Sequence, residues 1–100
     1  LTPSGGSLHV RVALRQRAPG EARNAIAAVF GSVSNAKHVW VVDPDIDIRA
    51  DGQVDWAMAT RFQADRDLVV ATGFRAVPLD PSLMGARTGA KQALIVVFPL

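Results

Sequence analysis

Cysteine is absent from the chain, and glutamate occurs once, at Glu21. Without thiols the chain forms neither a disulfide framework nor a thiolate metal site. This is consistent with a reducing compartment, and we predict a cytoplasmic protein. A single glutamate excludes a pair of glutamates for acid–base catalysis. No serine or threonine stands in the sequence context of a nucleophile elbow, so nucleophilic catalysis is not indicated either.

Long apolar segments and concentrated charge are missing as well. Residues 93–100 form the longest apolar run, which is far too short to span a bilayer, and residues 1–6 lack the features of a signal peptide. The net charge is +2, and the basic residues are scattered among acidic ones. A nucleic-acid binder would gather its cations on one face, whereas Arg11, Arg15 and Arg17 lie on the expected outer face of a strand. We therefore predict neither a membrane nor a nucleic acid as partner.

The composition describes one globular domain. Of the 100 residues, 49% are hydrophobic and 20% are charged, so residues 1–100 can bury one small core but not two. Apolar and polar residues alternate over residues 8–14, which is the period of a half-buried strand. Helical spacing follows over residues 20–30, with Glu21 in the first turn and Gly31 placed to end the helix.

A second group of elements follows the same pattern. Residues 38–42 are continuously apolar, which indicates a strand buried on both faces. Asp51 is a suitable N-cap for a helix over residues 52–63, and residues 67–72 form a third strand that Gly73 ends. The order predicts an α/β fold, a two-layer sandwich of a mostly parallel sheet with βαβαβ order.

The last quarter of the chain is less regular. Residues 74–77 are interpreted as a short fourth strand, and two prolines make residues 78–82 a rigid turn. Residues 83–90 are rich in glycine and predict a mobile loop, while residues 92–98 form a final apolar strand. The run Gly85–Lys91 has the composition of a phosphate-binding cradle, with a flexible surface loop as the alternative.

Three alternating aspartates, Asp43, Asp45 and Asp47, follow the second predicted strand. An EF-hand loop starting at Asp43 would need glycine and glutamate where the chain has Ile48 and Val54, so that calcium site is excluded. Mg²⁺ held by two of the carboxylates stays an alternative to a solvated turn whose carboxylates accept from backbone donors. Because parallel sheets bind ligands at this end of their strands, the turn is a secondary candidate site.

Two other polar positions are expected to be structural. Arg61 lies on the apolar side of its predicted helix, where a guanidinium is costly unless a carboxylate pairs with it. We predict an ion pair with Asp65, Asp67 or the acidic turn, in preference to ligand binding. His9 and His38 belong to no triad or metal-ligand pattern, and His38 is expected to be a partly buried, hydrogen-bonded residue.

Three segments together resemble the UbiD-like non-oxidative aromatic-acid decarboxylases. They are LRQRAPGE at residues 14–21, the acidic turn and WAMATR helix within residues 38–70, and FRAVPLDPS at residues 74–82. The resemblance implies the C-terminal α/β domain, which mediates oligomerisation in that family. Members use prenylated FMN with a divalent cation and potassium to decarboxylate aromatic or α,β-unsaturated acids. Their catalytic carboxylates and metal ligands belong upstream of these segments, so the resemblance implies no catalytic or metal-binding residue in this chain, and no cofactor held by the chain alone.

One functional residue carries over from the resemblance. A family lysine after the glycine-rich loop approaches the flavin phosphate, and Lys91 fits that position. The following residues depart from the pattern, because Ile95 and Val97 replace the usual Asp and Thr. The resemblance therefore implies Lys91 as a cofactor-binding residue in altered surroundings.

The leading hypothesis is the C-terminal oligomerisation domain of a UbiD-like carboxy-lyase, inactive as an isolated chain. Its partners are a second copy of itself and an upstream flavin-binding domain. We expect Leu94, Val96 and Phe98 to be buried across the interface between copies. One alternative is a stand-alone protein-interaction domain that lost the cofactor, with residues 95–97 pairing with another chain as an exposed strand. Another is a small-ligand-binding module that uses the acidic turn.

Overall fold

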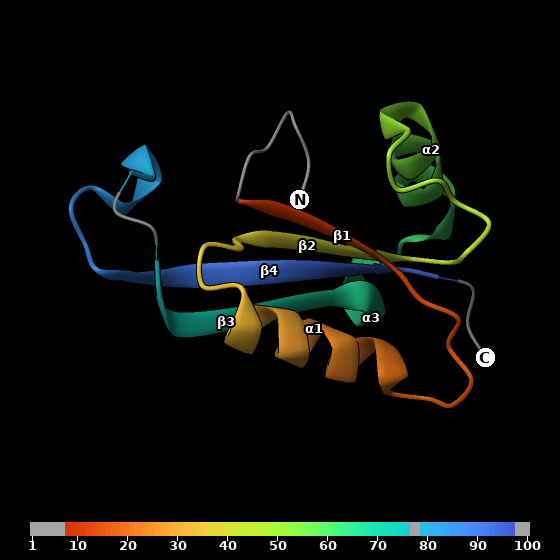
Figure 1. Ribbon diagram of the computed structural model, residues 1–100, viewed down its shortest axis with the longest axis horizontal. Helices are drawn as coiled ribbons and strands as arrows, with labels where there is room; N and C mark the ends of the chain where they lie inside the picture. Colours follow the sequence, from red (N-terminus) through yellow and green to blue (C-terminus); the bar gives the residue numbers. More distant parts are fainter. Residues whose placement is uncertain (1–7, 77–78, 98–100) are drawn as a thin grey trace.

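The computed structural model describes residues 8–76 and 79–97, which form a four-stranded sheet with helices packed on it (Figure 1). The predicted strand–helix–strand–helix order at the start of the chain is confirmed. Among the described residues no helix is long and apolar enough to cross a membrane. In chain order the elements are β1 His9–Ala13, α1 Glu21–Ser32, β2 His38–Val42, α2 Asp51–Arg61, α3 Ala64–Asp67, β3 Leu68–Arg75, the 3₁₀ turn η1 Pro81–Leu83, and β4 Thr88–Val96.

The sheet is mixed, with strand order β1-β2-β4-β3. β1, β2 and β4 are parallel, and β3 runs antiparallel to β4 at the edge. The α/β class and a mostly parallel sheet are therefore as predicted, but the second βαβ unit is wrong. After α2 the chain passes to the far edge of the sheet and returns through a connection short enough to join antiparallel strands.

The helices lie on both faces of the sheet, so the predicted two-layer arrangement is not what forms. α1 covers one face and α2 covers part of the other (Figure 1). Each face has its own core of buried side chains. The α1 core contains Val10, Ala22, Ile26, Phe30, Ala36, Val39, Val41, Ala93, Ile95 and Val97, and the α2 core contains Val42, Ile46, Val54, Ala57, Leu94 and Val96.

β4 lies in the centre of the sheet, between β2 and β3. Ile95 and Val96 already pair with Val41 and Val42 of β2, and Leu94 and Val96 are 7% and 0% exposed because they pack in the α2 core. Phe98 lies outside the described residues. The predicted mobile loop at residues 83–90 is also shorter than expected, because β4 begins at Thr88.

β3 extends beyond the position where the sequence predicted its end. Gly73 does not terminate it but lies in a bulge between Ala71 and Phe74, with φ +77°. After this irregularity Phe74 and Arg75 pair again with β4, so they continue β3 and form no separate strand.

The first residues of α1 and α2 are stabilised by different interactions. Glu21, in the first turn of α1, accepts hydrogen bonds at 2.6 Å from the backbone amides of Arg17 and Ala18. Asp51 is not the N-cap of α2, because the helix begins at this residue and its carboxylate pairs with Arg11 at 2.7 Å. Arg11 therefore reaches across to α2 and does not lie on an outer face. α1 also continues past Gly31, to Ser32.

Candidate functional site

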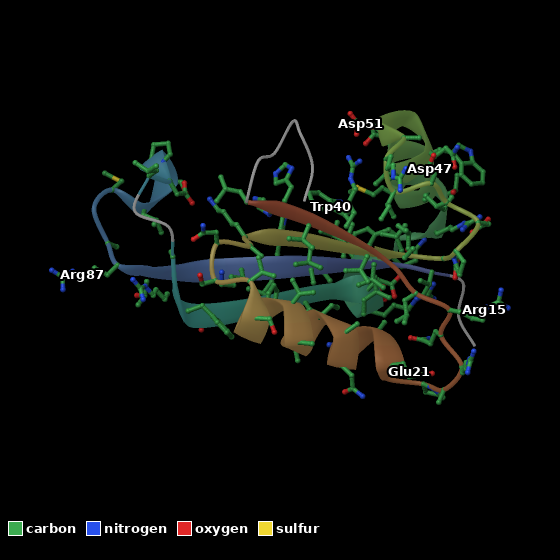
Figure 2. The ribbon with its side chains drawn as sticks, in the orientation of Figure 1. Arg15, Glu21, Trp40, Asp47, Asp51 and Arg87 are labelled. Atoms are coloured by element: carbon green, nitrogen blue, oxygen red, sulfur yellow. The ribbon has the colours of Figure 1, made fainter. Side chains whose placement is uncertain are left out.

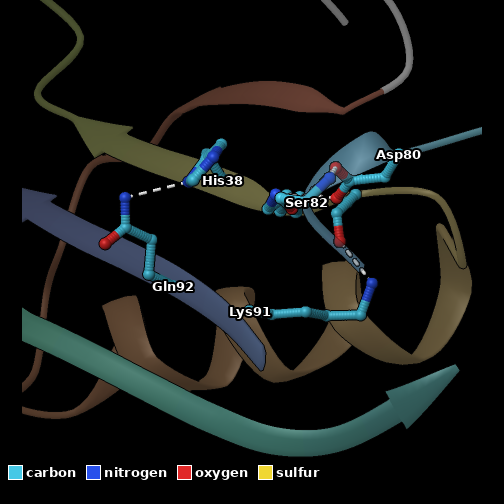
Figure 3. Close-up of polar contacts among 7 residues, drawn as sticks. His38, Asp80, Ser82, Lys91 and Gln92 are labelled. Carbon is cyan, nitrogen blue, oxygen red and sulfur yellow. Dashed lines mark hydrogen bonds and ion pairs between the residues drawn. The ribbon is translucent and has the colours of Figure 1, made fainter. Parts of the chain in front are cut away.

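Lys91 lies on β4 opposite Ala71, with its side chain on the α1 side of the sheet (Figure 3). Its ammonium donates to the carbonyl oxygen of Ser34 at 3.0 Å and also to that of Ala36. The residue is 5% exposed, and burial lowers the pKa of the ammonium. Lys91 thereby fastens β4 to the loop that joins α1 to β2.

The charge of Lys91 is less well compensated than that of Lys37. Lys37 Nζ lies 2.7 Å from Asp80 Oδ2, whereas the ion pairs that the described residues form do not include Lys91. Carbonyl oxygens satisfy the hydrogen-bonding capacity of the ammonium without neutralising its charge. An anionic group, such as a phosphate or a carboxylate, is the ligand that this buried cation favours.

Asp80 organises the turn next to Lys91 (Figure 3). Its carboxylate accepts hydrogen bonds from Lys37 Nζ at 2.7 Å, from Ser82 Oγ at 2.7 Å and from the Ser82 amide at 3.0 Å. These donors, Lys37 first, lower the pKa of Asp80 from 3.8 to about 2. The network holds η1 against the start of β2. η1 overlaps the segment for which the sequence predicted a rigid turn.

The space between Lys91, Lys37 and Asp80 is small, about 10 Å³, which is room for a single water. Leu83 of η1 also borders it and packs close to β4. A Cβ atom placed on Gly89 would lie 2.7 Å from Leu83 Cδ2, so the glycine allows this approach. A ligand group larger than water can reach Lys91 only after η1 moves.

The glycine-rich run Gly85–Lys91 does not form the cradle that its composition suggested. Its second half belongs to β4, and only residues 84–87 connect η1 to that strand. Arg87 is exposed and points away from the sheet (Figure 2), whereas Lys91 points inward. The two cations expected to share a phosphate are thus directed to different places.

The acidic turn is occupied by Arg61. Its Nη1 donates to Asp43 Oδ2 at 3.1 Å and to Asp45 Oδ1 at 3.0 Å, and its Nη2 donates to Asp45 Oδ2 at 2.8 Å. The hydrogen bond with Arg61 lowers the pKa of Asp45, and the same bond raises the pKa of Arg61. Asp47 accepts from the backbone amide of Arg49 at 2.9 Å. The predicted ion pair of Arg61 is therefore confirmed.

The Mg²⁺ alternative and the ligand-binding module lose their support with that ion pair. Within residues 8–76 and 79–97, no group of three or more His, Cys, Asp or Glu side chains is placed to hold a metal. Two of the three carboxylates in the turn instead bind the guanidinium that pins α2 to the end of β2.

A histidine cluster on the α2 side of the sheet was missed by sequence reasoning. His9 and His38 are register partners on β1 and β2, and their rings meet edge to face with centroids 5.2 Å apart. His38 Nδ1 is 2.9 Å from Gln92 Nε2 (Figure 3). The centroids of the His9 and Trp40 rings are 4.9 Å apart. Both strands begin with His-Val, and this shared start was the available signal. Burial lowers the pKa of both histidines.

This cluster is part of a sheet face that α2 leaves open. One row across the four strands consists of His9, His38, Gln92 and Val70, and Leu68 lies in the next row. Val70 is 61% exposed and Leu68 is 38% exposed, although both stand on the face that buries Leu94. A hollow of about 220 Å³ lies between His9, Arg11 and Trp40 on the sheet and the facing side of α2. The face combines half-buried aromatic rings with exposed aliphatic side chains.

Comparison with known proteins indicates a decarboxylase relationship. Residues 1–95 match the family described as the 3-octaprenyl-4-hydroxybenzoate carboxy-lyase C-terminal domain. The chain is 46% identical over 101 residues to anhydromevalonate phosphate decarboxylase of Aeropyrum pernix, covering 100% of this chain and 23% of that protein. It is 48% identical over 63 residues to gallate decarboxylase of Lactiplantibacillus plantarum, covering 63% of this chain and 13% of the relative.

A solved structure shows the same fold. The UbiD-class enzyme HmfF from Pelotomaculum thermopropionicum, in complex with FMN, superimposes with a TM-score of 0.92 at 39% identity. The superposition covers 100% of this chain and 22% of that enzyme. The chain therefore spans less than a quarter of the length of these relatives, and it corresponds to their C-terminal domain.

Proposed function

Because this chain belongs to the family of the 3-octaprenyl-4-hydroxybenzoate carboxy-lyase C-terminal domain, we propose that residues 1–100 are the oligomerisation domain of a longer carboxy-lyase. That enzyme would act in the cytoplasm on aromatic or α,β-unsaturated carboxylic acids. The isolated chain would be inactive, since its one glutamate is bound to the backbone amides of Arg17 and Ala18. Acid–base chemistry then belongs to the upstream part of the polypeptide.

The observation that carries the oligomerisation role is the open sheet face, on which Val70 and Leu68 are 61% and 38% exposed. Apolar side chains that are exposed together on one sheet face mark interfaces. Among the described residues β3 also has a free edge, whose backbone groups could pair with β3 of a second copy. We therefore assign the interface between copies to this open face and not to Leu94 and Val96, which α2 already covers.

Analytical ultracentrifugation tests the role directly. The chain is expected to sediment as a dimer or larger species whose mass falls on dilution. Val70→Asp places a charge on the open face and should yield a monomer, because a buried unpaired carboxylate is costly. Arg23→Asp, on an exposed position of α1, is the matched control and should leave the association unchanged. A monomeric wild-type chain at every concentration would overturn the proposal.

The cofactor of the longer enzyme would be prenylated FMN, which would carry the decarboxylation chemistry while the protein binds and orients it. Lys91 supports one contact to the cofactor, because it is a buried cation without a carboxylate partner among the described residues, and η1 would have to move to admit a phosphate. Ile95 and Val97 pack in the α1 core, so apolar contacts replace the hydrogen bonds expected there. The divalent cation and potassium would be held upstream.

A further inference from the structure

The connection between β3 and β4 carries two of the most exposed apolar side chains of the described residues. Leu79 is 90% exposed and Met84 is 93% exposed. Met84 also adopts a left-handed backbone with φ 51°, which is uncommon outside glycine. Leaving such side chains in water forgoes the favourable free energy of burying them. Exposure of this degree on both sides of one short turn indicates a surface that another molecule covers.

Residues 80–83 of this connection are anchored to the rest of the domain. Asp80 ties it to Lys37 through a 2.7 Å ion pair, and Leu83 packs next to Gly89 of β4. In Figure 1 η1 stands out from one end of the sheet. Leu79 and Met84 are therefore held in place on either side of an anchored turn, and little conformational entropy is lost when a partner binds them.

Two arginines stand at the base of the same projection. Arg75 pairs with Thr88 across the β3–β4 ladder, and the neighbouring Ala76 amide donates to the carbonyl oxygen of Arg87 at 3.2 Å. Both arginines are exposed, and neither Arg75 nor Arg87 belongs to an ion pair that residues 8–76 and 79–97 form. The two arginines flank a hollow of about 660 Å³. Two exposed guanidiniums that form no ion pair among the described residues favour a partner that carries a carboxylate.

The start of β1 lies at this end of the molecule. The carbonyl oxygen of Leu8, the first described residue, accepts from the amides of Lys37 and His38 at 2.8 and 2.9 Å. Leu8 also borders the small space that Asp80 and Leu83 line. An upstream part of the polypeptide would lead through residues 1–7 to Leu8, at the end of the molecule that carries the β3–β4 connection.

We propose that residues 79–88, with Arg75, are the docking surface for the upstream part of the same longer polypeptide. The upstream surface would present apolar side chains to Leu79 and Met84 and a carboxylate to the two arginines. This inference rests on the proposed function, since it requires an upstream part. It concerns a different surface from the open sheet face, so the two can fail separately.

Hydrogen–deuterium exchange of the longer polypeptide and of the 100-residue chain tests the docking. Amides of residues 79–88 should exchange at least about tenfold more slowly in the longer protein. The pair Leu79→Ser and Met84→Ser should abolish that difference while leaving the melting temperature of the 100-residue chain unchanged. The double variant Arg75→Glu and Arg87→Glu should also abolish the difference in exchange, because it replaces the two positive charges that would meet a carboxylate. Val70→Ser, on the open face, is the control and should leave the protection intact.

Other outcomes overturn the inference or separate it from the oligomerisation role. Equal exchange of residues 79–88 in both proteins would mean that nothing upstream covers them. Protection in the 100-residue chain that disappears on dilution would assign the surface to a second copy. If the 100-residue chain is a dimer and residues 79–88 exchange equally in both proteins, the docking is rejected and the oligomerisation role is kept. If the chain is a monomer and these residues exchange slowly in the longer protein, the docking is kept and the oligomerisation role is rejected.

Discussion

Arg61 and Asp45 form a bidentate ion pair between the last turn of α2 and the turn after β2, with Nη1–Oδ1 and Nη2–Oδ2 distances of 3.0 and 2.8 Å. Arg61 is 8% exposed, whereas the Asp45 side chain is 59% exposed. Asp43 adds a second acceptor at 3.1 Å. The pair is thus intermediate between a surface ion pair and a buried one.

Arg61→Met should lower the free energy of unfolding by about 2–3 kcal/mol. That value lies between the roughly 1 kcal/mol of an exposed pair and the 3–5 kcal/mol lost when a buried pair is broken. Arg66→Met is the matched control, because the Arg66 side chain is 55% exposed and lies 3.4 Å from Asp67. Thermal or urea unfolding of both variants measures the difference, and equal small shifts would contradict the structural role of Arg61.

Asp80→Asn should change the acid sensitivity of the chain. The pKa of Asp80 is about 2 in the folded state, against an ordinary value of 3.8. A lowered carboxyl pKa means that the stabilisation is complete above pH 3.8 and is lost as the pH falls through about 2. Urea unfolding at a series of pH values should show the wild-type advantage over Asp80→Asn shrinking through that range. An advantage that does not vary with pH would exclude the Lys37–Asp80 network as its source.

The histidine cluster should make stability and self-association sensitive to mild acid. Burial, followed by Arg11, lowers the pKa of His9, while burial, His9 and Lys37 lower the pKa of His38 against the opposing effect of Asp80. The unfolded chain then takes up protons first, so stability falls as the pH drops below 6.5.

Protonation also places charge on the open sheet face, so the sedimenting mass should fall between pH 7.5 and about pH 5. The double variant His9→Gln and His38→Gln should remove most of this pH dependence. A wild-type mass that is the same at both pH values would contradict the prediction.

Local patterns account for much of the fold. The periods of residues 8–14 and 20–30, and the apolar run at residues 38–42, predicted β1, α1 and β2, because each pattern is set by neighbours in sequence. The position of β4 in the centre of the sheet could not be predicted, since it depends on pairing between residues far apart in the chain. Its continuous apolarity is now explained by burial between β2 and β3 on both faces.

In the candidate site, too, contacts set by neighbours in sequence were predictable and contacts set by strand pairing were not. The pairing of Arg61 was predictable because a buried guanidinium must meet a carboxylate, and only a few were near in sequence. The His9–His38 contact was not, because it requires the register between two parallel strands. The direction of Lys91, toward the loop carbonyls of Ser34 and Ala36, likewise depends on how α1 connects to β2.

Lys91→Met should separate the folding role of this lysine from its role toward an anion. Burial lowers the pKa of Lys91 below 10.5, so the folded chain gives up its proton before the unfolded chain does. The stability of the wild type relative to Lys91→Met should therefore rise with pH as the solution passes from the lowered pKa toward 10.5. Unfolding measured at several alkaline pH values checks this sign, and a difference that is constant or falls with pH would contradict it.

In the longer polypeptide the same substitution should weaken the retention of FMN, because a phosphate loses its charge-assisted partner. Lys37→Met is the matched control: Lys37 already has Asp80 as its counter-charge, so its loss should affect stability more than flavin retention. Flavin absorbance after gel filtration measures retention independently of turnover. Equal retention by the wild type and Lys91→Met would leave Lys91 only its role of joining β4 to the loop between α1 and β2.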